Sequence, residues 1–420
     1  MTRIRMFIAY LAVGACSAPA CAPSPQAHRS PEAARELHDR IITIDTHVDI
    51  PANFATSEVD PGVRGERQVD LPKMREGRLD AAFFAVYVGQ GERAPDAYAA
   101  VHAQAVAKFE AIHRMVEMYP DQIGLAVSPG DVVRLHDAGM LAACIGIENG
   151  YAIGRDLSLL QEYYDLGARY ITLTHNGHND IGDSSDPLPR LGDGEAEHGG
   201  LSPFGEDVVR EMNRLGIMVD VSHVARSTML DAVRISRAPV IASHSATKAL
   251  ADVSRNLDDE QLLALKGNGG VIQVVGLGQF VMVDPPEKAA AVQAIRDEMG
   301  ITSRQAYRAL TDEQRTEYRT RITALDERWP AANVSDFVDH IDHAVQLIGI
   351  DHVGISSDFD GGGGVVGWND AGETFNVTLE LVQRGYTDAE IEQLWGGNLL
   401  RVWREVEDVR DLMTAESDGS

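Results

Sequence analysis

Eight short apolar runs, separated by longer segments with helical spacing, constrain the fold of this chain more than any other feature. The runs cover residues 41–49, 81–88, 142–150, 168–176, 217–223, 239–245, 269–277 and 351–361. Several are apolar throughout, as in strands of a parallel sheet that helices cover. Helical spacing is clear at 95–120, 202–216 and 334–349. Alternation of strand and helix repeated eight times predicts an α/β fold, the (β/α)8 TIM barrel.

The longest interval between two runs is 278–350, just before the eighth predicted strand. It contains the charged stretch "DEQRTEYRTRITALDERW", which predicts a helical insertion at that point. We find neither an internal repeat nor a domain linker after residue 34, so residues 35–420 are expected to form a single barrel domain. A doubly wound open sheet is the alternative, but no Gly-x-Gly-x-x-Gly follows the first run.

The N-terminal residues have the composition of an export signal. Arg3 and Arg5 precede an apolar stretch that is too short to span a bilayer. The sequence "VGAC", ending at Cys16, resembles a bacterial lipobox, so we expect a signal over 1–22 with a possible lipid anchor at Cys16. Cleavage near Ala20 is the alternative. A tether over 23–34 follows, and we expect an exported protein, either periplasmic or a membrane-anchored lipoprotein.

Net charge and cysteine content exclude some functions. The chain has 64 acidic and 37 basic residues, with a formal net charge of −27, so binding to a nucleic-acid backbone is not expected. Of the three cysteines, two lie in or beside the export signal. Cys144 lies within the apolar "LAACIGI" and is expected to be a small buried residue. The sequence therefore predicts no disulfide framework.

Polar residues of the kind that bind metals stand at the end of most of the apolar runs. They are His47 and Asp49 in the first run, Glu148 in the third, His175 in the fourth, His223 in the fifth, His244 in the sixth, and Asp358 and Asp360 in the eighth. Enzymes with a barrel fold build their active sites at the carboxyl ends of the strands. We therefore expect these side chains to converge on one site.

The spacing of these residues favours a metal centre. His47 and Asp49 are two residues apart, so both side chains face the same side of a strand. Glu148 has two carboxylate oxygens with which it could bridge two ions, and His223 and His244 could serve the second ion. Imidazole and carboxylate ligands suit Zn²⁺. Taken singly, each histidine is more often structural, but so many buried charged groups together require a metal partner.

Other polar residues are expected to have structural roles. Asp45 shares the parity of His47 but lies deeper in the strand, which indicates a supporting position. The glycines at 361–364 lack the Lys-Ser/Thr of a phosphate loop and are expected to form a flexible loop. The histidines that fall in loops or helices, and are therefore not expected to be ligands, are His178, His198, His340 and His343.

Seven short motifs occur in a family-specific order: "DTHVDI", "GIENG", "LTHN", "DVSH", "SHS", "SRN" and "SDFDG". In this order they resemble the membrane (renal-type) dipeptidases, binuclear zinc peptidases of the amidohydrolase superfamily. The resemblance runs from about residue 35 to 410 and includes "WGGNLLRVW" near the end. The 278–335 insertion and the glycine run after Asp360 are less typical of the family.

The resemblance implies a role for each matched residue. His47 and Asp49 look like ligands of the first of two zinc ions, Glu148 like the bridging carboxylate, and His223 and His244 like ligands of the second ion. Asp358 resembles the general acid/base, His175 the residue that polarises the scissile carbonyl, Arg255 the clamp for the substrate's C-terminal carboxylate, and Tyr87 a residue lining the substrate pocket. A homodimer is also implied. From the sequence alone, Arg255 could instead form a surface ion pair with Asp258 or Asp259.

The function expected from this reading is zinc-dependent hydrolysis of dipeptides, including L,D-dipeptides. Two Zn²⁺ ions would lower the pKa of a bridging water and supply hydroxide near neutral pH. One alternative is another amidohydrolase activity, on a cyclic amide, lactone or phosphoester. Many such enzymes bridge their metals with a carboxylated lysine, whereas here the bridge is Glu148. The other alternative is a non-catalytic lipoprotein that binds metal or peptide.

Overall fold

A computed structural model describes residues 30–303, 306–307 and 309–419. The predicted export signal, Cys16 and residues 23–29 of the predicted tether lie outside the described residues. Helix α1 (Pro31–His38) begins with Ser30 as its N-cap, whose hydroxyl accepts a hydrogen bond from the backbone of Ala33. The predicted end of the tether at residue 34 therefore falls inside a helix.

Eight parallel strands form a barrel, as the alternation of apolar runs predicts. In spatial order they are β1 (Ile44–Asp49), β2 (Ala81–Tyr87), β4 (Leu141–Glu148), β5 (Ala168–Thr172), β6 (Met218–Asp220), β7 (Ile241–Ser245), β8 (Val271–Val275) and β9 (Val353–Ser356). The barrel closes just beyond the end of β9, where the backbone N–H of Asp49 donates to the carbonyl of Phe359 at 2.9 Å. The predicted α/β barrel class is thus confirmed.

A further strand, β3 (Ile123–Leu125), pairs only with the first residues of β4. The sequence did not indicate it because three residues are too few to show a period. The strands are also shorter than several of the apolar runs. In particular, β5 ends at Thr172, β6 at Asp220 and β9 at Ser356, so the polar residues that follow them lie in loops.

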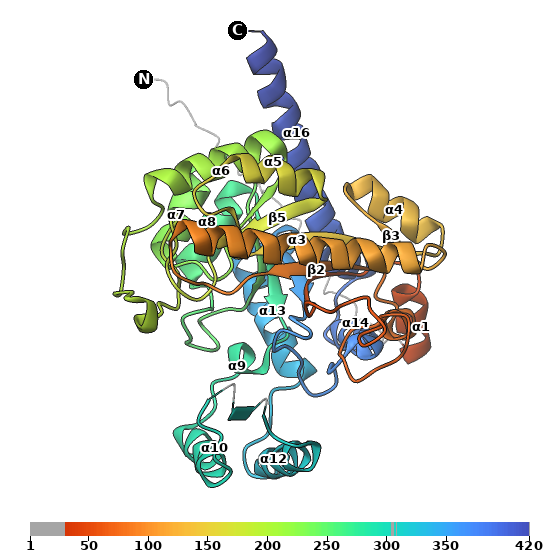
Figure 1. The fold of residues 1–420 in the computed structure, drawn as a ribbon. Helices are drawn as coiled ribbons and strands as arrows, with labels where there is room; N and C mark the ends of the chain where they lie inside the picture. Colours follow the sequence, from red (N-terminus) through yellow and green to blue (C-terminus); the bar gives the residue numbers. More distant parts are fainter. Residues whose placement is uncertain (1–29, 304–305, 308, 420) are drawn as a thin grey trace, which may run out of the picture.

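Helices cover the outside of the barrel (Figure 1). They include α2 (Leu71–Gly77), α3 (Pro95–Met118), α4 (Pro129–Asp137), α5 (Ser158–Asp165), α6 (Pro203–Leu215), α7 (Arg226–Ile235), α8 (Asp259–Asn268), α13 (Val334–Ile348), α14 (Phe375–Gln383), α15 (Asp388–Glu392) and α16 (Asn398–Asp418). Local sequence signals explain their ends. Helix α6, for example, begins after Ser202, whose hydroxyl accepts from the N–H of Gly205, and ends at Gly216 in the left-handed conformation. No helix among the described residues is long and apolar enough to cross a membrane.

The predicted insertion before the last barrel strand is helical. It comprises α9 (Gly278–Val281), α10 (Pro286–Glu298) and α12 (Asp312–Leu325). In Figure 1, α10 and α12 stand apart from the barrel, below it in that view. Helix α12 has no buried residue, which agrees with the charged sequence from which the insertion was predicted.

The barrel interior contains a compact cluster of apolar side chains. Phe83, Cys144 and Tyr170 belong to it, as does Trp403 of α16, whose ring packs against that of Phe83. Cys144 is fully buried, as expected from its surroundings. Because alternate residues of a strand face the same side, Cys144, Gly146 and Glu148 of β4 all point inward. Glu148 therefore stands at the top of the packed interior.

Candidate metal-binding active site

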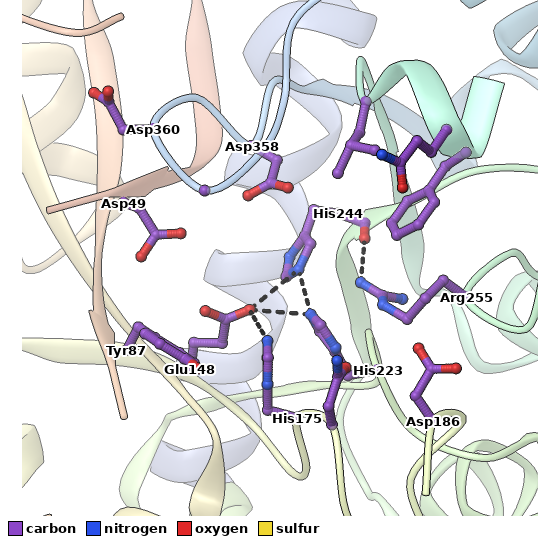
Figure 2. Close-up of a pocket in the computed structure, with 15 residues that line it drawn as sticks. Asp49, Tyr87, Glu148, His175, Asp186, His223, His244, Arg255, Asp358 and Asp360 are labelled. Atoms are coloured by element: carbon purple, nitrogen blue, oxygen red, sulfur yellow. Dashed lines mark hydrogen bonds and ion pairs between the residues drawn. The ribbon is translucent and has the colours of Figure 1, made fainter. Parts of the chain in front are cut away.

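A cavity of about 400 Å³ lies at the carboxyl ends of the barrel strands. Nine of the residues singled out from the sequence line it: Asp49, Tyr87, Glu148, His175, His223, His244, Arg255, Asp358 and Asp360. His47 is fully buried, and its Nε2 lies 3.7 Å from the carboxylate of Asp49 and 3.6 Å from that of Glu148. Loops after β5, β6 and β9 carry His175, His223 and Asp358, so the structure brings together all the residues expected to form the site (Figure 2).

Glu148 is the centre of the cluster. Its Oε1 lies 3.0 Å from Nε2 of His223, 3.4 Å from Nε2 of His244 and 3.7 Å from Nε2 of His175. Its Oε2 lies 3.6 Å from Nε2 of His47. The dashed lines of Figure 2 show how the imidazoles converge on this carboxylate. One carboxylate thus faces imidazole nitrogens through both of its oxygens.

Three groups of side chains have ligand atoms close enough to share an ion. They are His47 with Glu148 and His244, Glu148 with His175 and His223, and His47 with Asp49 and Asp358. The predicted pairs are also adjacent: Nε2 of His47 lies 3.7 Å from Oδ2 of Asp49, and Nε2 of His223 lies 2.9 Å from Nε2 of His244. The sequence did not predict that His175 lies close enough to be a ligand.

The chemistry of this cluster fits a divalent metal. Nε2 of His47 is buried without a hydrogen-bond partner among the described residues, although buried polar atoms are normally paired. Its other ring nitrogen, Nδ1, lies 2.9 Å from the hydroxyl of Tyr170, which donates to the carbonyl of Thr46 at 3.1 Å. A ligating histidine is usually held in this way through its second nitrogen. The residues present therefore fit a bound metal ion.

Tyr170 is a residue that the sequence did not single out. It is fully buried in β5, and its ring occupies the space above Gly146 of β4, where an added Cβ would lie 2.0 Å from a ring carbon. Glycine at 146 therefore leaves room for a tyrosine that reaches His47 across the barrel. A tyrosine at an inward-facing position of a barrel strand is the signal that was available in the sequence.

Burial and neighbouring charges shift the pKa values of the site. Burial, together with the charges of Asp49 and Glu148, raises the pKa of Asp358 well above its usual value. Burial alone would also raise the pKa of Glu148, but the surrounding imidazoles of His47 and His175 outweigh it and hold that pKa well below its usual value. Asp358 and Glu148 are therefore suited to different tasks, one to carrying a proton and the other to remaining ionised.

Several site residues have a left-handed backbone. The φ angles are 65° at His223, 57° at Asp358 and 65° at Asp360, and Asn149, next to Glu148, has a φ of 83°. Such conformations are uncommon for residues with a Cβ and gather at functional sites where the surrounding structure holds them. Of these residues, His223, Asp358 and Asp360 line the cavity.

The glycines at 361–364 form a loop after β9, as expected, and specific contacts hold this loop. An added Cβ at Gly361 would lie 2.2 Å from Oδ1 of Asp358 and 2.3 Å from Oδ2 of Asp49. The N–H of Gly363 donates to the carbonyl of Asp358 at 2.8 Å, and that of Gly364 donates to Gly276 at 2.7 Å. Glycine is needed at 361 because the chain packs against the two aspartates, and at 363 because an added Cβ would lie 1.8 Å from the carbonyl oxygen of Ser357.

Arg255 lies inside the cavity and not in a surface ion pair. It is 5% exposed, and its Nη2 donates to the carbonyl of His244 at 3.1 Å. Its Nε has no hydrogen-bond partner among the described residues. The alternative partners are engaged elsewhere, because Asp258 binds Arg226 at 3.0 Å and Asp259 contacts His343 at 3.0 Å. Arg255 therefore has donors left for a ligand.

The cavity wall beside Arg255 contains residues that the sequence did not indicate. Asp186 faces Arg255 in Figure 2 and accepts a hydrogen bond from the hydroxyl of Ser254 at 2.6 Å. Leu277, Gln279 and Phe280, at the start of the insertion, complete this wall. Their side chains are not of the types that bind metals or catalyse hydrolysis, so only the fold shows that they line the cavity.

The remaining polar residues take structural positions. Asp45 accepts hydrogen bonds from the backbone of Ser357 at 3.0 Å and of His47 at 3.2 Å, and burial raises its pKa to about 6. Asp360 pairs with Arg67 at 3.2 Å. The histidines not expected to be ligands contact other groups: His178 the carbonyl of Gly194, His198 that of Asn179, His340 that of Val281, and His343 the carboxylate of Asp259.

Comparison with known protein families identifies the family of this chain. The family described as membrane dipeptidase (peptidase family M19) matches residues 31–417. The chain belongs to the membrane dipeptidase family. The resemblance found in the sequence is therefore confirmed, and with it a hydrolase of peptide bonds in a family of metallopeptidases.

Individual relatives agree with this membership of the membrane dipeptidase family. Dipeptidase aclJ of Aspergillus oryzae (strain ATCC 42149 / RIB 40) is 34% identical over 347 residues, which cover 81% of this chain and 71% of that protein. The crystal structure of the probable dipeptidase PvdM from Pseudomonas aeruginosa is 36% identical, with a TM-score of 0.80 and coverage of 90% of this chain and 98% of that one.

A more distant structure shares the fold. It is that of a metallo peptidase from Rhodobacter sphaeroides liganded with a phosphinate mimic of the dipeptide L-Ala-D-Ala. It is 22% identical, with a TM-score of 0.67 and coverage of 87% of this chain and 99% of that one. At this identity the likeness concerns the fold alone.

Proposed function

We propose that this protein hydrolyses dipeptides with two Zn²⁺ ions held by His47, Asp49, Glu148, His223 and His244. The main support for this proposal is the position of Glu148. One of its carboxylate oxygens lies 3.0–3.7 Å from three imidazole nitrogens, and the other lies 3.6 Å from a fourth. When bound, the ions supply Lewis-acid activation of the peptide carbonyl and of the attacking water near neutral pH.

The remaining side chains suit the steps of peptide hydrolysis. Asp358, whose pKa is raised, accepts the proton of the attacking water at a carboxylate oxygen and passes it to the leaving amine. Nε2 of His175 donates to the carbonyl oxygen as negative charge develops there. Tyr87 packs against His175, with ring centroids 4.8 Å apart, and limits its movement.

Substrate length follows from the position of Arg255. Its guanidinium binds the substrate's C-terminal carboxylate through charge-assisted hydrogen bonds. Arg255 lines the same cavity of about 400 Å³ as Asp49, Glu148 and Asp358. A short and fixed distance therefore separates the proposed carboxylate clamp from the metal site, where the scissile bond would lie. This arrangement favours dipeptides over longer peptides.

The stereochemistry of the substrate forms part of the proposal. We expect the protein to accept L,D-dipeptides as well as L,L-dipeptides, because the fold is also that of a peptidase crystallised with a mimic of L-Ala-D-Ala. The proposed clamp and metal site contact the terminal carboxylate and the scissile amide of a dipeptide, and both groups are present in either series.

Amino-acid release from a panel of L,L- and L,D-dipeptides tests the proposal. The zinc-loaded protein without its first 22 residues is compared with the same protein after chelation, and each dipeptide with its C-terminally amidated form. Turnover that requires metal and a free C-terminus supports dipeptidase chemistry. A protein that binds two Zn²⁺ ions but releases no amino acid from any dipeptide would overturn it.

We also propose that the protein is exported and carries a lipid at Cys16. We expect residues 35–420 to fold as one domain, and the protein to form a homodimer. The basic and apolar start of the chain and the "VGAC" motif support export and lipidation. Mass spectrometry of the membrane fraction tests lipidation, since an unmodified chain beginning near Cys21 would show ordinary cleavage. Light scattering tests the dimer.

A further inference from the structure

We propose that Asp220 and Ser243 are positioning residues that hold His244 with its proton on Nδ1. In this form the lone pair of Nε2 points at Glu148, ready for a cation. The inference rests on the proposed metal site for its purpose. The position of the proton can nevertheless be measured without any metal, so the two proposals can fail separately.

Asp220, at the end of β6, is surrounded by donors. Its Oδ1 accepts from the backbone N–H of Ser222 at 3.0 Å and from that of Ser243 at 2.8 Å. Its Oδ2 accepts from the hydroxyl of Ser243 at 2.6 Å and from the hydroxyl of Thr172. The residue is fully buried. A carboxylate with four donors around it acts only as an acceptor.

The hydrogen bonds from His244 through Ser243 to Asp220 determine which ring nitrogen of His244 carries the proton. The hydroxyl of Ser243 has one proton, and that proton points at Asp220. Nδ1 of His244 lies 2.8 Å from the same hydroxyl oxygen, so a hydrogen bond forms there only if Nδ1 carries a proton and donates it. A neutral imidazole has one N–H. Nε2 of His244 is therefore an acceptor.

The surroundings of Nε2 explain why this form matters. Nε2 of His244 lies 3.4 Å from Oε1 of Glu148 and 2.9 Å from Nε2 of His223. A lone pair that faces a carboxylate oxygen is repelled unless a cation or a proton lies between them. The hydrogen-bond chain through Ser243 thus prepares His244 to accept a cation, in the way that a second hydrogen bond orients metal-binding histidines.

The backbone around this chain is also held in place. The N–H of His244 donates to the hydroxyl of Ser222 at 2.9 Å, and the hydroxyl of Thr46 donates to the carbonyl of Ser243 at 2.6 Å. Ser222 follows β6, whereas Ser243 lies beside His244 on β7. We expect these two backbone hydrogen bonds to keep His244 in place when the hydroxyl of Ser243 is removed.

Two neighbouring serines provide a matched test. Ser243 and Ser245 flank His244 on β7 and are both fully buried, but the hydroxyl of Ser245 contacts that of Ser222 instead of the imidazole. Affinity for Zn²⁺ is measured by competition with a chromophoric chelator. We expect Ser243→Ala to weaken binding about 10- to 100-fold and Ser245→Ala to leave it within about threefold. Equal losses in the two variants, or no loss in Ser243→Ala, would overturn the proposal.

Proton positions are measured directly by imidazole ¹⁵N NMR of the metal-free protein at pH 8. The His244 signals are those that disappear in His244→Asn. We expect the Nδ1–H form in the wild-type protein. In Asp220→Asn the amide donates to Ser243, whose hydroxyl then turns to His244, so the Nε2–H form is expected. A wild-type His244 in the Nε2–H form would overturn the proposal, whether or not either variant folds.

Discussion

The Nε2 atoms of His223 and His244 lie 2.9 Å apart, and both face the same carboxylate oxygen of Glu148 at 3.0 and 3.4 Å. The two histidines come from different strand ends, so no local sequence contact requires this approach. The lone pairs of these ring nitrogens and the carboxylate repel one another unless a cation or a shared proton lies between them. Glu148 is therefore the residue through which the metal site is most directly tested.

Glu148→Gln should lose bound metal and dipeptidase activity together. The amide is nearly isosteric but carries no charge and replaces one acceptor oxygen with a donor. Zinc content is measured by elemental analysis after gel filtration, with Glu260→Gln, an exposed partner of Arg226, as the control. Retention of two zinc ions in Glu148→Gln would remove Glu148 from the bridging position.

Asp358→Asn should keep its metal and lose turnover. The variant cannot accept the proton of the attacking water, and general acid–base catalysis commonly contributes about 10²- to 10⁴-fold to the rate. The measurements are kcat for a reactive dipeptide and zinc content of the same sample. A kcat close to that of the wild-type protein would show that another group moves the proton.

Arg255→Ala should act on substrate capture. We expect kcat/KM for dipeptides with a free C-terminus to fall about 10- to 100-fold, because a hydrogen bond to a charged group contributes about 1.5–3 kcal/mol. Arg226→Ala, which removes an arginine from a surface ion pair with Asp258, is the matched control. If both variants retain full kcat/KM, the carboxylate clamp lies elsewhere in the cavity.

Gly146→Ala should destabilise the protein and weaken its metal site. The added Cβ would lie 2.0 Å from the ring of Tyr170, and the displaced ring would no longer hold His47. Overpacking of this kind destabilises by about 1–3 kcal/mol. In Gly267→Ala, where no atom lies within 4 Å of the new Cβ in helix α8, stability should be unchanged or higher. Denaturant unfolding of the two variants would contradict this reasoning if they proved equally stable.

His38 should make the stability of the fold sensitive to mild acid. Trp395 donates to the hydroxyl of Thr378, which donates to Nδ1 of His38, while Nε2 of His38 donates to the carbonyl of Gly77. This network requires a neutral ring, and burial holds the pKa of His38 below its usual value.

The sign of the effect follows from proton linkage. The unfolded chain, with an ordinary histidine pKa of about 6.5, binds a proton before the folded protein does. The contribution of His38 to stability is therefore fully present above the pKa of the unfolded chain. It is lost as the pH falls from that value toward the lower pKa of His38 in the folded protein. Free energies of unfolding at pH 7.5 and 5.5 should fall more for the wild-type protein than for His38→Gln. Identical decreases in the two proteins would assign the acid sensitivity to other groups.

The sequence predicted the barrel and most of the site because both depend on local patterns. Apolar runs mark the strands, and a proposed ligand such as His47 or Glu148 at the end of a run is placed by the fold itself. Asp220, Ser243 and Tyr170 could not be recognised in this way, since their roles depend on register between neighbouring strands. Neither could the burial of Arg255 be deduced, because it depends on a loop whose path the sequence does not specify.

Two other differences have physical causes of the same kind. Strand β3 has three residues and is defined by its pairing with β4 more than by its own composition. The glycines at 361–364 look like a flexible segment when read alone. In the structure, an added Cβ at Gly361 would lie within 2.3 Å of carboxylate oxygens of both Asp49 and Asp358, so only glycine fits there.

The insertion before β9 contributes to the cavity wall but contains none of the proposed metal ligands. Gln279 and Phe280 of α9 form part of the cavity wall, while the helices that follow stand apart from the barrel (Figure 1). Two hydrogen bonds, from Asn256 to the carbonyl of Phe280 and from His340 to that of Val281, attach α9 to the rest of the chain. Substrate preference can thus diverge through exchange of one continuous segment while every proposed metal ligand is inherited unchanged, and chimaeras between relatives have a natural junction on either side of it.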